Sequence, residues 1–141
     1  MAAFNKFNSF SEFIAEKVFN LQSDTLKVML TNTAPVPANS LKADIAEIAA
    51  GNGYVAGGIQ VTVSSSAQTA GVYKLVLADG TFTASGGAFP PARYAVLYDD
   101  TPSSPLKPLI GWWDYGSQFT LATGESITVD FDDTLGVLQL S

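Results

Sequence analysis

Short apolar runs separated by turn residues recur roughly every 8 to 15 residues, and they constrain the fold of this chain more than any other feature. In several of them apolar and polar side chains alternate, which is the period of a strand with one buried face. The runs that we expect to form strands are residues 25–31, 59–64, 72–78, 81–84, 93–98, 109–115, 117–121, 126–131 and 136–140. The pattern predicts a mainly β protein, an antiparallel β-sandwich or jelly-roll-like barrel of about eight strands. Asp79-Gly80 is typical of a hairpin turn.

Residues 89–116 contain both Trp and three of the five Tyr of the chain. We expect residues 94–98 and 109–115 to form a central hairpin of buried strands, joined by a stiff, proline-rich loop, residues 99–108. Neighbouring strand residues point to opposite faces, so at least one of Trp112 and Trp113 should lie in the core. An exposed Trp beside Asp residues would suit a carbohydrate-binding module, and this interpretation stays open as an alternative.

The first 22 residues show a helical pattern, unlike the strand patterns that follow them. Ser9 and Glu12 have the spacing of a capping box, and the apolar residues that follow predict one amphipathic helix over about residues 10–20. Phe4 and Phe7 precede this helix, in an arm that is either folded back on its own domain or inserted into a neighbour. We expect a single domain, residues 1–141, with residues 1–22 as arm plus helix.

The composition excludes several kinds of chemistry. The chain has no His and no Cys, which removes disulfides, thiolate nucleophiles, Ser-His-Asp arrangements and nearly all zinc sites. A net charge of −6 argues against nucleic acid as a partner. No apolar run is long enough to cross a membrane and no signal peptide is evident, so we expect synthesis and retention in a cytoplasm. We expect no enzyme and no cofactor.

Two further regions are candidate sites, and a third predicts a short helix. Residues 51–58 are rich in glycine but lack the order of a phosphate-binding motif, and residues 41–50 predict a short helix. Asp130, Asp132 and Asp133 crowd one turn, where they could hold calcium, although Asp residues in loops usually serve the turn itself. We therefore expect no metal.

Charge is unevenly distributed along the chain. Residues 48–73 and 80–92 carry no charged side chain, and the excess of acidic residues lies in residues 99–141. Monomers usually spread charges of both signs over their surface, so this pattern predicts a covered face, with a neutral hydroxyl-rich surface as the alternative.

Three segments carry a family resemblance: FNKFNSF at the start, LKVMLTNTAPV with the later AEIAAGNGYVAGG, and RYAVLYDDT with the later PLIGWWDYGSQFTLATGESITVDFDDTLGVLQL. Together they resemble a family of small virion structural proteins that are encoded with the head and tail genes of tailed bacteriophages. The resemblance implies a non-enzymatic structural role and brings no catalytic residues with it.

From this resemblance we expect a capsid decoration protein that bridges capsid subunits, located in the virion and made in the host cytoplasm. Its partners would be the major capsid protein or other virion proteins, and we expect a homo-oligomer. The contacts that we expect are Phe4, Phe7, Phe10, Pro102, Pro105 and Lys107, and deletion of residues 1–8 should leave a folded monomer. The alternative is a tail, neck or fibre module that binds a receptor or glycan through Trp112 or Trp113.

Overall fold

The structure is a computed structural model that describes residues 2–141. The described chain forms ten strands, one short α-helix and one 3-10 turn. In chain order they are β1 (Asn5–Lys6), α1 (Ser9–Ala15), β2 (Leu26–Thr31), η1 (Lys42–Asp44), β3 (Ile59–Val61), β4 (Val63–Thr69), β5 (Val72–Leu77), β6 (Gly80–Thr83), β7 (Ala92–Asp99), β8 (Leu109–Phe119), β9 (Ser126–Val129) and β10 (Leu138–Leu140). The predicted mainly β fold with an N-terminal helix is confirmed, with ten strands rather than about eight.

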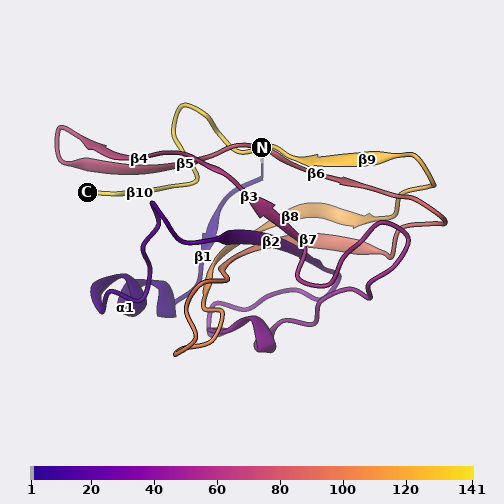
Figure 1. Ribbon diagram of the computed structural model, residues 1–141, viewed down its shortest axis with the longest axis horizontal. Coiled ribbons are helices and arrows are strands. Elements are labelled where there is room, and N and C mark those ends of the chain that lie inside the picture. The colour runs from indigo at the N-terminus through magenta and orange to yellow at the C-terminus, as the bar shows by residue number, and fades with distance from the viewer. Residues whose placement is uncertain (1) are drawn as a thin grey trace.

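The strands form two layers, visible in Figure 1 as an upper and a lower set of ribbons. The large sheet has the strand order β1-β8-β7-β2-β3. The small layer consists of a three-stranded sheet, β10-β5-β4, and a two-stranded sheet, β6-β9. The strand pairs within these sheets are antiparallel. The central pair of the large sheet, β7 with β8, is the hairpin that the aromatic stretch predicted.

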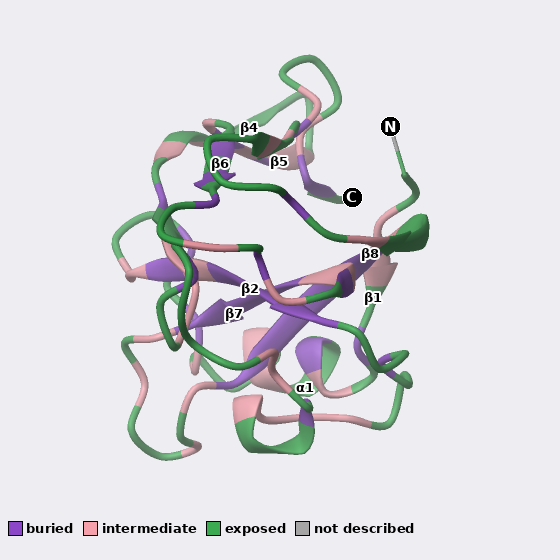
Figure 2. Ribbon diagram, turned by 90° about the vertical axis from the view of Figure 1, so that its right-hand side faces the viewer, coloured by how far each residue is buried: buried purple, intermediate pink, exposed green. Residues whose placement is uncertain are grey.

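Strands β2, β7 and β8 of the large sheet are largely buried (Figure 2), and their apolar side chains belong to two separate clusters. Leu26, Val28 and Leu30 of β2 join the main core, to which the small layer contributes Leu75 and Phe82. A second cluster lies on the opposite face, and it consists of Phe7, Met29, Ile45, Val96, Tyr98, Leu109 and Trp112. Because side chains alternate along a strand, β2 and β7 can supply both clusters at once.

The N-terminal helix is shorter than its apolar pattern predicts, and the predicted capping box is wrong. The helix ends at Ala15 because Lys17 adopts a left-handed conformation, with φ of 63°, and the amide of Val18 donates to the carbonyl of Phe13. The turn brings Phe19 back onto Phe10, with 5.4 Å between ring centroids. Asn8 occupies the N-cap position without a side-chain capping hydrogen bond, and the buried Ser9 hydroxyl has no hydrogen-bond partner within residues 2–141.

Asp79-Gly80 does not form a hairpin. Strand β5 pairs with β4 and β10, whereas β6 pairs with β9, so the chain passes from one small sheet to the other at this point. A carboxylate oxygen of Asp79 accepts a hydrogen bond from the amide of Phe131 at 2.9 Å. A Cβ at Gly80 would lie 2.6 Å from Ile59 Cδ1, so a larger residue here would require the end of the Ile59 side chain to shift.

Candidate functional site

The N-terminal arm is folded back on its own domain. Strand β1 pairs with β8, and the side chains of Phe7 and Phe10 are 0% and 2% exposed. The Phe7 ring lies 4.6 Å from the Trp112 ring, between centroids, and Phe4 lies 5.4 Å from Trp113. Of the two alternatives that the sequence left open, the structure shows the intramolecular one. The prediction that Phe7 and Phe10 contact a partner is therefore corrected, because both side chains are already buried within their own domain.

Both tryptophans are buried, at 9% and 7% exposure for Trp112 and Trp113. They point to opposite faces of the large sheet, as predicted, but each face is covered: Trp112 belongs to the second cluster and Trp113 to the main core. The alternative in which Trp112 or Trp113 stacks on a sugar is therefore corrected, because neither ring is exposed. The exposed aromatic side chain next to them is Tyr115, at 61%.

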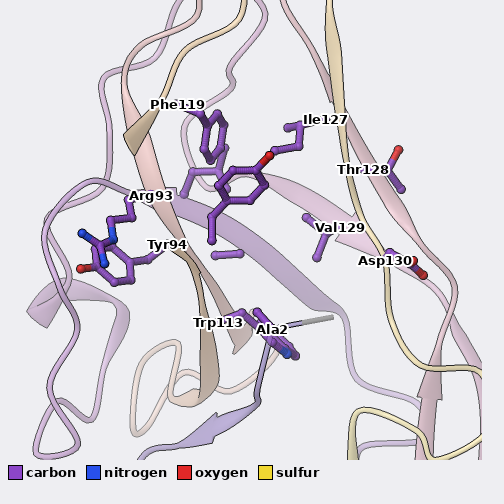
Figure 3. Close-up of a pocket in the computed structure, with 12 residues that line it drawn as sticks. Ala2, Arg93, Tyr94, Trp113, Phe119, Ile127, Thr128, Val129 and Asp130 are labelled. Atoms are coloured by element: carbon purple, nitrogen blue, oxygen red, sulfur yellow. The ribbon is translucent and has the colours of Figure 1, made fainter. Parts of the chain in front are cut away.

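A cleft of about 220 Å³ opens between the two layers (Figure 3). The side chain of Phe119 from the large sheet lies on one side, and those of Ile127 and Val129 from β9 lie on the other. Tyr94 also lines the cleft, but its ring packs against the second cluster on the opposite face of the sheet. The remaining lining residues are Ala2, Leu30, Arg93, Ala95, Trp113, Tyr115, Thr128 and Asp130. The cleft is mostly apolar, with polar groups at its margin.

An irregularity in β8 shapes the mouth of this cleft. Ala92 pairs with Phe119 and Tyr94 pairs with Asp114, so residues 115–118 of β8 bulge out opposite Arg93 alone. The Asp114 carboxylate accepts a hydrogen bond from the amide of Gly116, whose φ is 103°, and this turn lifts Tyr115 out of the sheet. The spacing Asp-x-Gly within an apolar run is the sequence signal that could have indicated the bulge.

An ion pair flanks the exposed tyrosine. The Arg93 guanidinium donates to both carboxylate oxygens of Asp114, at 2.8 and 3.1 Å, and lies 5.3 Å from the centroid of the Tyr94 ring. The hydrogen bonds from Arg93 and from the Gly116 amide hold the pKa of Asp114 below its ordinary value. Both groups of the pair are partly exposed and could exchange one hydrogen bond for another with a polar ligand.

The proline-rich loop is anchored at its base. Asp100 pairs with Lys27 at 3.1 Å and also with Lys107, so the predicted contact residue Lys107 already has an intramolecular partner. Pro102 and Pro105 are half-buried on the loop. The side chain that protrudes is Leu106, at 57% exposure, which the sequence pattern did not single out.

The small layer presents an outward face without charge over β6 and β9. Thr81 and Thr83 of β6 are exposed there, facing Thr128 and Ser126 of β9. The paired hydroxyls lie 3.2 Å apart for Thr81 and Thr128 and 2.7 Å apart for Thr83 and Ser126. We call these four residues the hydroxyl face. Thr81 and Thr83 come from the charge-free segment 80–92, whereas Ser126 and Thr128 lie between Glu125 and Asp130 in the acidic part of the chain.

The glycine-rich segment has a structural role centred on Glu47. One of its carboxylate oxygens accepts hydrogen bonds from the Tyr54 hydroxyl at 2.7 Å and the Gly57 amide at 2.6 Å, and the other accepts from Lys42 at 2.8 Å. Burial raises the pKa of Glu47, but these hydrogen bonds outweigh it and leave the pKa lowered. A Cβ at Gly58 would lie 1.9 Å from the Val28 carbonyl oxygen, so the glycine allows two backbones to touch.

The side chain of Asp132 closes the acidic turn near the C-terminus. The Asp132 carboxylate accepts hydrogen bonds from the amides of Thr134 at 2.8 Å and Leu135 at 2.6 Å, and these lower its pKa. Within residues 2–141, no three Asp or Glu side chains gather as metal ligands would. The α-helix described in this range is also too short to cross a bilayer.

Comparison of the chain with protein-family models, with curated proteins and with solved structures gave no match.

Proposed function

We propose that this protein is a non-enzymatic bacteriophage virion component, a capsid decoration protein that bridges neighbouring capsid subunits. The observation that carries the proposal is the uncharged hydroxyl face of the small layer, Thr81, Thr83, Ser126 and Thr128. The sequence resemblance to small virion structural proteins of tailed phages supports the same role.

The physics of interfaces favours this face for a permanent contact. Charged groups are depleted from the centre of protein interfaces because desolvating an unpaired charge is costly. Threonine and serine offer hydroxyl groups that can donate to or accept from a partner, and their methyl or methylene groups can be buried with little penalty. The face can therefore be covered by a capsid subunit without leaving an unpaired ion.

The folded-back arm changes which residues provide the contact. Phe7 belongs to the second cluster, so removal of residues 1–8 would open the core instead of detaching a free arm. Leu106 on the anchored loop is exposed and offers a further apolar contact of the kind first expected from Pro102 and Pro105.

The test uses capsids of the encoding phage assembled without this protein. Purified wild type should co-sediment with them, and Thr128→Lys should lose most of the binding because it places a charge at the centre of the hydroxyl face. The matched control is Ala43→Lys on the exposed turn η1, which lies outside this face and should bind like wild type. Normal binding by Thr128→Lys together with unchanged melting temperatures would contradict the proposal.

One observation favours a second candidate function, a glycan- or receptor-binding module. Tyr115 is exposed at the mouth of the interlayer cleft, beside the Arg93–Asp114 pair. An aromatic face flanked by one donor and one acceptor side chain is suited to a sugar ring and its hydroxyl groups.

A glycan array, or competition for adsorption to cells, separates the two candidates. Saturable binding that is lost in Tyr115→Ala and retained in Leu135→Ala, an equally exposed apolar position, would support the module. The absence of any saturable glycan or cell binding by the wild type would eliminate it.

A further inference from the structure

A fully buried carboxyl group lies at the base of the proline-rich loop. Asp99, the last residue of β7, is 0% exposed. One of its oxygens accepts a hydrogen bond from the Thr101 amide at 3.0 Å. The other, Oδ2, is buried and accepts no hydrogen bond from the described residues.

The segment before β2 lies against Asp99, because Leu26 pairs with Asp99 across β2 and β7. Asp24 in this segment supplies a second carboxyl group, which acts on Asp99 both as a hydrogen-bond partner and as a negative charge. Asp24 is itself held in place because its Oδ2 accepts from the Asn20 amide at 2.9 Å. The other charged groups at the site are Asp100 from the loop, Lys27 from β2 and Lys107 from the end of the loop. Both lysines pair with Asp100, so neither neutralises Asp99.

Two apposed carboxylates, of which Asp99 is fully buried and Asp24 half-buried, cannot both remain ionised at low cost. A proton on Oδ2 of Asp99 removes the penalty in one step, since the hydroxyl can then donate to the Asp24 carboxylate. Burial, with the hydrogen bond and charge of Asp24, raises the pKa of Asp99 to about 8.

The pair sits where two distant segments meet. The amide of Asp100 donates to the Thr25 carbonyl at 2.8 Å, and the amide of Thr25 donates to the Thr101 hydroxyl at 2.8 Å. We propose that Asp99 keeps a proton on its buried carboxyl group and donates it in a hydrogen bond to Asp24, and that this hydrogen bond fastens the base of loop 99–108 to the segment preceding β2. Loss of the proton places two negative charges at this junction and loosens the loop.

The direction of the pH effect follows from linkage. The folded chain retains a proton that the unfolded chain releases near the ordinary value of 3.8. Between about pH 4 and pH 8 the folded state therefore binds more protons, and stability falls as the pH rises through this window. One full proton corresponds to a tenfold rise in the unfolding equilibrium constant per pH unit.

The window above pH 5 isolates this pair from the other perturbed groups. The carboxyl groups of Asp44, Glu47, Asp100, Asp114 and Asp132 have lowered pKa values and are ionised throughout it. Tyr54 and Tyr98 have raised pKa values and remain protonated.

The experiment measures urea unfolding of the full chain from pH 5 to pH 9. Wild type should become less stable with rising pH, with a slope approaching tenfold per unit. Asp99→Asn should flatten this slope and exceed wild type in stability at pH 8 to 9, because the Asn amide can donate to Asp24 without a titrating proton. Asp133→Asn, an exposed position on the acidic turn, is the matched control and should keep the wild-type slope.

Two direct readouts complete the test. The side-chain carboxyl carbon of Asp99, followed by NMR in the wild type, should titrate near pH 8, and the amide protection factors of Asp100 and Thr101 should fall over the same range. This measurement decides the matter even if Asp99→Asn does not fold. Titration of Asp99 near pH 4 would overturn the proposal. So would stabilisation of the wild type by millimolar calcium at pH 8 that Asp99→Asn lacks, because the pair would then hold a cation and not a proton.

Discussion

Replacing Phe7 with alanine tests whether the N-terminal arm is an integral part of the fold. The Phe7 side chain is fully buried in the second cluster, and its ring packs against Trp112 at 4.6 Å between centroids. Phe→Ala substitutions in cores typically cost about 3–5 kcal/mol, from lost transfer free energy plus the cavity left behind. An aromatic pair of this kind contributes about 0.5–1.5 kcal/mol beyond its burial. We therefore expect the free energy of unfolding to fall by about 4 kcal/mol.

The loss is large against the roughly 5–15 kcal/mol that stabilises a typical domain. Urea denaturation followed by Trp fluorescence measures it, and the wild-type slope should be preserved if only stability changes. Val36→Ala is the matched control, because Val36 is half exposed and should change stability by less than about 0.5 kcal/mol. A loss below about 1 kcal/mol for Phe7→Ala would refute the folded-back arm and revive the arm as a partner contact.

Three further substitutions probe other features of the structure. Gly58→Ala should destabilise the fold by several kcal/mol or prevent folding, because its Cβ would collide with the Val28 carbonyl and its φ is 79°; thermal melting of soluble protein checks this. Gly111→Ala should displace the Phe4 ring, which lies 2.1 Å from the added Cβ, and should therefore speed limited proteolysis between residues 2 and 8. Glu47→Gln should lower the free energy of unfolding by about 1–3 kcal/mol at pH 7 and by less at pH 3. Because the pKa of Glu47 is lowered in the folded protein, its contribution to stability is present above the ordinary value of 4.5 and is lost as the pH falls through the lowered folded value. Unfolding experiments at the two pH values measure the difference.

The strands were largely predictable because they follow from local patterns. Alternation in residues 25–31 predicted β2, and the two apolar runs on either side of the proline-rich loop predicted the β7–β8 hairpin. Opposite orientation of Trp112 and Trp113 also follows from the period of a strand. Each of these features depends on residues that are close in the sequence.

The failures share a different physical cause. Asp79-Gly80 has the local chemistry of a hairpin, but the chain passes here from β5 to β6, which pairs with β9, and the Asp79 carboxylate accepts a hydrogen bond from the amide of Phe131. Ser9 and Glu12 have the spacing of a capping box, yet the N-cap is Asn8, whose amide donates to the carbonyl of Pro37, and Ser9 is the first helical residue. Contacts with distant residues accompany both departures from the local pattern.

For the candidate sites, too, some features follow from the sequence and others only from the tertiary structure. The absence of His and Cys and the charge-free segments are properties of the sequence itself, and they already restricted the chemistry and indicated an uncharged surface. The arm's position, the bulge that exposes Tyr115 and the meeting of Asp24 with Asp99 depend on pairing between segments far apart in the chain. Burial and the approach of distant charges are set only when the layers close, so tertiary structure alone decided which aromatic side chain is exposed and which carboxyl group retains a proton.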